Sequence, residues 1–160
     1  MTESTNFDID SLLDGTLDDL ADMPEYKPFP AGAHLATIMK WEQKTMPDKK
    51  DASKTNVIMN VRLAAKETVE PAVADEVVSP GQETEYGFFL IHHSAPKAME
   101  MGQGQFKEIM KSLAGHFGAK SNRELIADST GADVLIVTGF RADKTDKTKK
   151  YSQLENLKVV

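Results

Sequence analysis

Basic and aromatic side chains gather in segments that could together hold a single-stranded nucleic acid. Sites of that kind combine a positively charged groove for the phosphates with aromatic rings on which bases stack, each stack contributing about 1–3 kcal/mol. The candidate phosphate-binding cations form two groups along the chain, namely Lys44, Lys49, Lys50, Lys54 and Arg62, and then Arg141, Lys144, Lys147, Lys149 and Lys150. The candidate stacking rings are Trp41, Tyr86, Phe140 and Tyr151. Together these residues predict binding of a single-stranded nucleic acid.

A simpler interpretation of the same residues stays open. Lysines in hairpin tips often serve solubility alone, and aromatic residues on short strands usually lie in the core. Trp41 and Tyr151 are the better candidates for a solvated face, because each adjoins polar residues at the end of an expected strand. Segment 141–150 holds five bases against two acids, a local charge of +3.

Other site chemistry is weakly indicated. The chain has no Cys, so disulfides, thiolate metal sites and cysteine nucleophiles are excluded. His92 and His93 are adjacent, and neighbouring strand residues point to opposite faces, so they do not predict a shared metal. His34 and His116 are isolated, and no nucleophile adjoins a base. We therefore expect no metal, no cofactor and no enzymatic activity.

Five strands and a helical connection must position these side chains. Strands are expected at 34–41, 56–68, 85–91, 133–140 and 151–160, and the second has the clearest apolar–polar alternation. Between the third and fourth strands, apolar residues at three-and-four spacing predict a helix that ends at Gly118. Ser121 and Glu124 have the spacing of a capping box, which predicts a second short helix.

The element order predicts the fold class. A mainly β chain in the order β-β-β-α-β-β is typical of an OB-fold-like five-stranded barrel, and we expect this domain over residues 31–160. In that fold the loops between strands one and two, and between strands four and five, flank the binding face. Both of these loops are the lysine-rich ones here, which is the strongest functional signal in the sequence.

An acidic arm, residues 1–25, precedes the expected domain through a Pro-rich lead-in that ends at residue 30. The net charge is −6, yet residues 1–26 hold eight acids and no Lys or Arg, so the remainder has 17 acids against 19 bases. Apolar residues are interleaved with these acids, and we expect six of them to bind a partner: Phe7, Ile9, Leu12, Leu13, Leu17 and Leu20. A solvated, frayed terminus is the equally weighted alternative.

Three stretches together resemble a known group of proteins, namely residues 12–34, 102–118 and 141–160. The whole pattern resembles the single-stranded DNA-binding proteins, and related small proteins, encoded by tailed bacteriophages. The resemblance implies an OB-fold that coats single-stranded DNA without sequence preference in phage replication or recombination, in the host bacterial cytoplasm. One feature departs from the family, because its familiar replication proteins carry the acidic segment at the C-terminus, whereas this chain ends in Val159–Val160.

Two hypotheses follow from the sequence. In the first, the body binds single-stranded DNA while the acidic arm either occupies the binding groove or recruits phage or host replication and recombination proteins. In the second, the chain is a protein-interaction module that binds no DNA and acts through the arm, as a host-factor binder or a DNA mimic. A virion structural or accessory role is a weaker alternative. No apolar run approaches the roughly 18 residues that predict a membrane span, and a monomer or a dimer is compatible with the sequence.

Overall fold

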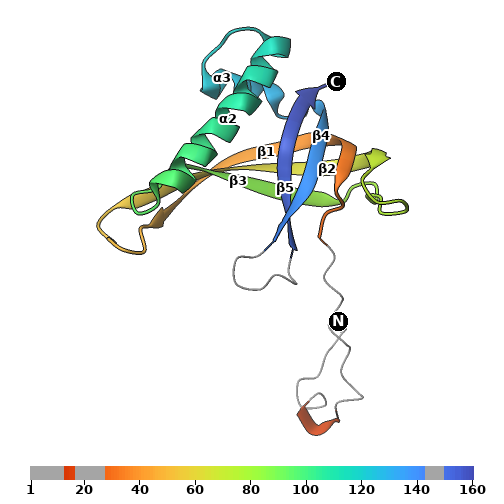
Figure 1. Cartoon of the computed structure of the whole chain (residues 1–160), viewed down its shortest axis with the longest axis horizontal. Helices are drawn as coiled ribbons and strands as arrows, with labels where there is room; N and C mark the ends of the chain where they lie inside the picture. The colour runs from red at the N-terminus through yellow and green to blue at the C-terminus, as the bar shows by residue number, and fades with distance from the viewer. Residues whose placement is uncertain (1–12, 17–27, 143–149) are drawn as a thin grey trace, which may run out of the picture.

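A computed structural model describes residues 13–16, 28–142 and 150–160. Five strands form one antiparallel sheet in the order β3-β2-β1-β4-β5 (Figure 1). The strands are β1 (Gly32–Pro47), β2 (Thr55–Pro71), β3 (Glu83–Ile91), β4 (Asp133–Ala142) and β5 (Lys150–Val159). The helices α2 (Pro96–Phe117) and α3 (Asn122–Ser129) connect β3 to β4. The prediction of a mainly β fold with a helical connection is confirmed, with two helices where the β-β-β-α-β-β order has one.

The strands extend further than the sequence pattern predicts. β1 and β2 form a hairpin that stays paired from Gly32 with Pro71 to Pro47 with Thr55. Residues 42–47, beyond the expected strand 34–41, are therefore strand. Likewise, Arg141 pairs with Tyr151 and Ala142 pairs with Lys150, so Arg141 and Lys150 lie on strands and not in the predicted loop. Cross-strand hydrogen bonding extends these strands beyond their apolar segments, because charged residues can face water along a hairpin.

The core lies between one face of the sheet and α2. Alternate positions on the central strands are fully buried, among them Ile38, Val61, Leu63 and Ile136. Phe29 of the lead-in is also buried in this cluster. This inward alternation is the reason that the strands form a single sheet with one packed face.

Helix α2 begins with Pro96 at its first turn and ends at Gly118, whose φ of 96° favours glycine. It buries Phe106, Ile109, Met110 and Leu113 against the sheet. The predicted capping box is present in α3, where Glu124 N–H donates to Ser121 Oγ at 3.2 Å. In the part of the chain that the structure describes, no helix is long and apolar enough to span a membrane.

The side chain of His34 fixes the lead-in to the sheet. His34 is fully buried, and its Nε2 lies 2.8 Å from the Pro30 carbonyl oxygen. Its Nδ1 lies 2.9 Å from Thr68 Oγ1 on β2, and Nε2 also lies 3.2 Å from Thr138 Oγ1 on β4. Burial lowers the pKa of His34, while the hydrogen bond to Pro30 opposes that shift. This isolated histidine of the sequence is therefore a structural residue.

Candidate nucleic-acid interface

The base of the β4–β5 hairpin brings four of the predicted site residues together. The Arg141 guanidinium carbon lies 5.9 Å from the centroid of the Tyr151 ring. Lys150 Nζ lies 6.0 Å from the centroid of the Phe140 ring. Successive strand residues alternate between faces, so these two pairs lie on opposite faces of the hairpin. Each face thus presents one aromatic ring and one cation, the combination that holds a base and its phosphate.

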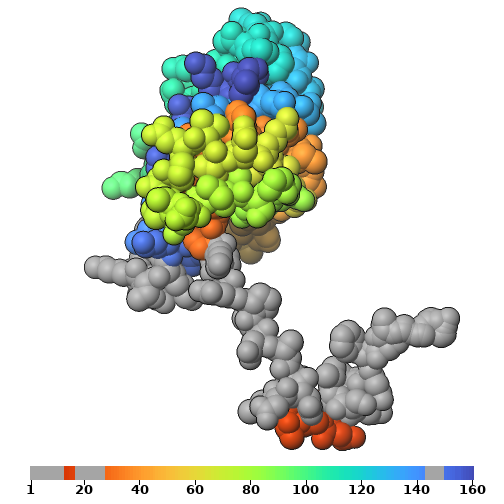
Figure 2. All heavy atoms as spheres, turned by 90° about the vertical axis from the view of Figure 1, so that its right-hand side faces the viewer, coloured from red at the N-terminus to blue at the C-terminus, as the bar shows by residue number. Residues whose placement is uncertain are grey.

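The Phe140–Lys150 face borders a hollow of about 820 Å³. Its walls include Pro28 and Pro30 of the lead-in, together with Val73 and Val77 of the β2–β3 connection. Figure 2 faces this side of the molecule, where the yellow-green β2–β3 connection lies beside the orange lead-in. Val73 and Val77 are each more than half exposed, so the hollow has apolar walls open to water. Asp75 and Glu76 also line it, and their charges disfavour a phosphate at that wall.

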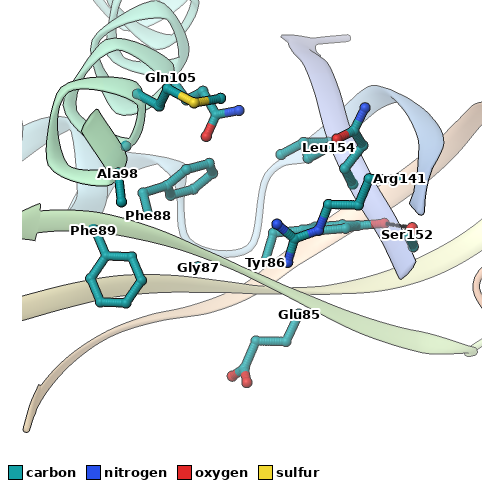
Figure 3. Close-up of a pocket in the computed structure, with 13 residues that line it drawn as sticks. Glu85, Tyr86, Gly87, Phe88, Phe89, Ala98, Gln105, Arg141, Ser152 and Leu154 are labelled. Carbon is teal, nitrogen blue, oxygen red and sulfur yellow. Dashed lines mark hydrogen bonds between the residues drawn. The ribbon is translucent and has the colours of Figure 1, made fainter. Parts of the chain in front are cut away.

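Arg141 also reaches a second hollow, of about 420 Å³, between β3, β5 and α2 (Figure 3). Tyr86 and Phe88 of β3 contribute aromatic rings to it, but both are buried. The Tyr86 hydroxyl lies 2.7 Å from the Ser152 hydroxyl of β5, and burial raises the pKa of Tyr86. This contact joins β3 to β5 where the two strands are not paired. Tyr86 is thus a core residue that offers no open ring for stacking.

Trp41 packs toward the helical layer. Its ring meets Phe106 of α2 edge to face, with centroids 6.2 Å apart, and its indole N–H donates to Ser129 Oγ at 3.0 Å. The side chain is half-buried against the core. A base would have to approach the part of the ring that these contacts leave open. Tyr151, at the hairpin base, is 40 % exposed, and Phe140 beside it is half-buried like Trp41.

The lysines of the β1–β2 connection lie in a loop that a buried carboxylate holds in place. Lys49, Lys50 and Lys54 are exposed, while Asp48 beside them is 2 % exposed. The Asp48 carboxylate accepts hydrogen bonds from the backbone N–H of Lys50 at 3.1 Å and from Asn56 Nδ2 at 3.0 Å. It also accepts a hydrogen bond from the Ser94 hydroxyl, which precedes α2.

These hydrogen bonds hold the pKa of Asp48 well below its ordinary value, the Ser94 bond having the largest effect and desolvation opposing it. The carboxylate therefore fixes the lysine-bearing loop to the start of α2. Asp48 was not among the residues predicted from the sequence. The sequence feature that could have predicted its structural role is the position of this Asp directly after Pro47, because Asp side chains commonly accept hydrogen bonds from the backbone two or three residues ahead.

On the outer face of β1, β2 and β3, basic side chains form ion pairs with neighbouring glutamates. Lys44 Nζ lies 3.8 Å from carboxylate oxygens of both Glu42 and Glu85. Arg62 lies within 3.6 Å of Glu85 and 3.8 Å of Glu83. Such exposed pairs contribute only about 0–1 kcal/mol each, so phosphates could displace the carboxylates, but the face attracts a polyanion weakly before contact.

The cations of the β1–β2 connection and those of the β4–β5 hairpin base lie at opposite ends of β1 (Figure 1), whereas Arg62, which pairs with Lys40, lies between them. The β1–β2 connection follows Pro47, whereas the β4–β5 hairpin base lies beyond Gly32, which pairs with Thr138. A strand of this length spans at most about 50 Å when straight. One nucleic-acid strand that touches both groups would therefore run along much of the sheet.

Other predicted site residues lie outside the described residues. They are Lys144, Lys147 and Lys149 of the hairpin tip, and Phe7, Ile9, Leu12, Leu17 and Leu20 of the acidic arm. Leu13 is described, and its side chain is 75 % exposed. Within residues 13–16, 28–142 and 150–160, no group of three or more His, Asp or Glu side chains is placed to hold a metal ion.

The chain matches no protein-family model, and it matches no curated protein.

Proposed function

We propose that this protein binds single-stranded DNA without sequence preference, through the β4–β5 hairpin and the lysines of the β1–β2 connection. The observation that carries the proposal is the pair of aromatic–cation contacts at the hairpin base, Phe140 with Lys150 and Arg141 with Tyr151. Only seven residues separate Ala142 from Lys150, so the length of the chain limits the distance between these rings and any lysine of the tip. Rings and cations are therefore available side by side.

The sheet supports an OB-like barrel as the scaffold for this binding. β1 pairs with both β2 and β4, and the sheet is open between β3 and β5, as in a partly open five-stranded barrel. In such barrels the first and last hairpin loops flank the ligand. The resemblance to phage single-stranded DNA-binding proteins supports a role in phage replication or recombination in the host cytoplasm, with the acidic arm recruiting partners or competing with DNA.

The test is fluorescence anisotropy of a labelled oligo-dT, titrated with the full chain at several salt concentrations. For single strands, the slope of log K against log salt is about −0.7 per phosphate contact. We expect Lys144→Ala with Lys147→Ala to make the slope shallower by about 1.4, the effect of two lost contacts. We expect Tyr151→Ala to weaken binding by roughly fivefold or more at fixed salt, as the loss of a stack requires.

The matched control is Arg123→Ala with Lys158→Ala, which also removes two exposed cations but from α3 and the far end of β5. The slope should be unchanged in this variant. Equal effects of both double variants would mean non-specific charge attraction, and no binding at low salt would refute the proposal.

The ion-paired outer face favours a second candidate function. Because Lys44 and Arg62 are already paired with Glu42, Glu83 and Glu85, a protein-interaction module that binds no DNA is the alternative. In that case the full chain and a chain without residues 1–25 should both pass through single-stranded DNA cellulose at low salt. Retention of either one favours DNA binding.

A further inference from the structure

A hollow between α2 and α3 has an unusual distribution of charge. It has a volume of about 530 Å³ and an apolar floor that includes Phe106, Met110 and Leu125. Three lysines, Lys107, Lys111 and Lys120, line it, and no acidic residue does. The three other hollows described for this molecule each have at least one carboxylate in their walls. This α2–α3 hollow therefore suits a ligand that is apolar on one side and acidic around it.

The lysines are available at the rim. Lys111 Nζ lies 3.4 Å from Glu108 and Lys120 Nζ lies 2.6 Å from Asp128, and these are surface pairs that a competing carboxylate can exchange with. Within the described residues, Lys107 forms no ion pair. The hollow thus has one uncompensated cation and two cations in exposed pairs.

The acidic arm has the complementary composition. It contains eight acids and no base, and Ile9, Leu13, Leu17 and Leu20 are spaced to lie on one face of a helix. Leu13 is 75 % exposed, so its apolar surface has no cover within the described structure. Acidic peptides with apolar anchors at such spacing are the usual occupants of basic-rimmed apolar grooves.

The position of the lead-in indicates whether the hollow binds the arm of its own copy or that of a neighbouring copy. In Figure 1 the described residues of the lead-in, 28–31, lie at the end of the body opposite to α3. The twelve residues from Leu20 to Gly32 reach about 40 Å only when fully extended. This tether limits the reach of the arm within one copy, whereas an arm from a neighbouring copy has no such limit.

We propose that the acidic arm (residues 1–25) of one copy binds the α2–α3 hollow of a second copy. The contact is heterologous, so each copy keeps a free arm at one end and a free hollow at the other, and the assembly grows as an open chain. The contact itself needs no DNA. If the proposed function holds, copies along one strand would then bind it cooperatively.

The experiment is sedimentation velocity of the full chain, without DNA, over a range of concentrations at low and moderate salt. We expect wild-type protein to form species larger than dimers at low salt and to dissociate as salt rises, since charge pairs are screened. Lys107→Glu with Lys111→Glu, and separately Leu13→Ser with Leu17→Ser, should weaken association at least tenfold. The matched control is Lys49→Glu with Lys54→Glu, which makes the same charge change on the β1–β2 connection and should associate as wild type.

Mixing the two defective variants distinguishes a second copy from the same copy. The arm variant keeps its hollow and the hollow variant keeps its arm, so together they should form a one-to-one complex and nothing larger. Wild type that stays monomeric at every concentration, or a hollow variant that associates normally, would overturn the proposal. Variants that change only the shape of the monomer, with no complex on mixing, would place the arm in its own hollow and would also overturn it. Because no DNA is present, failure of the DNA proposal cannot produce any of these results.

Discussion

At Gly102 in α2, an added methyl group should favour the helix but clash with the neighbouring strand β3. The helix passes so close to the edge strand β3 that a Cβ at Gly102 would lie 2.6 Å from the backbone nitrogen of Phe89, and closer still to its carbonyl oxygen. In the next residue, Gln103 Nε2 donates to the Leu90 carbonyl oxygen at 2.6 Å. Helix α2 thus covers the open edge of the sheet, and this coverage depends on the absence of a side chain at Gly102.

The substitution Gly102→Ala should destabilise the protein despite a favourable local effect. Alanine in a helix interior is favoured over glycine by about 0.8–1 kcal/mol. Forcing an extra carbon into a packed contact costs about 1–3 kcal/mol. The opposing atoms here belong to the backbone of Phe89, which cannot rotate away as a side chain could. We therefore expect a net loss of roughly 0–2 kcal/mol in the free energy of unfolding.

Gly104 provides a matched control in the same helix. A Cβ there has no neighbouring atom within 4 Å, so Gly104→Ala should raise the free energy of unfolding by about 1 kcal/mol. Urea unfolding should therefore separate the two variants by about 1–3 kcal/mol, and each kcal/mol should lower the melting temperature by roughly 2–4 °C. Equal stability of Gly102→Ala and Gly104→Ala would refute the close approach of α2 to β3.

Two buried titratable groups predict how stability depends on pH. The pKa of Asp48 is lowered in the folded protein, mainly by the Ser94 hydroxyl, so its contribution is complete above pH about 4 and is lost as the pH falls below that value. Urea unfolding of Asp48→Asn should show a weaker loss of stability in acid than wild type, and parallel curves would contradict this. Burial lowers the pKa of His34, so protonation below about pH 6.5 favours the unfolded state, and stability should rise with pH through that range. His34→Gln should flatten this part of the curve, and an unchanged pH dependence in the variant would show that another group causes it.

Local patterns in the sequence were sufficient to predict the elements. The alternation around Val61 and Leu63 predicts β2, and the spacing of Phe106, Ile109 and Leu113 predicts α2. Such patterns depend only on which face of an element is buried. The strand ends were less well predicted, because pairing with a neighbouring strand, and not burial, carries β1 and β2 beyond their apolar residues.

The contacts that define the candidate site could not be predicted in this way, because they join residues far apart in the chain. Trp41 was expected on a solvated face, since polar residues follow it, but its indole N–H donates to Ser129, 88 residues away. The Tyr86 hydroxyl meets Ser152, 66 residues away. No local pattern contains the partner in such pairs. The aromatic–cation contacts of the hairpin base are different, because Phe140 and Lys150 are close in sequence and both were predicted as site residues.

The ion pairs of the outer face predict that the proposed binding of DNA depends on the hairpin more than on the sheet. Each cation on β1 and β2 must first leave a carboxylate before it meets a phosphate, so the net gain from Lys44 or Arg62 is a difference between two similar pairs. The tip of the β4–β5 hairpin holds more bases than acids, and this net positive charge favours contacts with phosphates. Affinity should thus fall more when charge is removed from the tip than when Lys44 and Arg62 are neutralised together. This ordering is opposite to that expected for a ligand spread evenly over the face of the sheet.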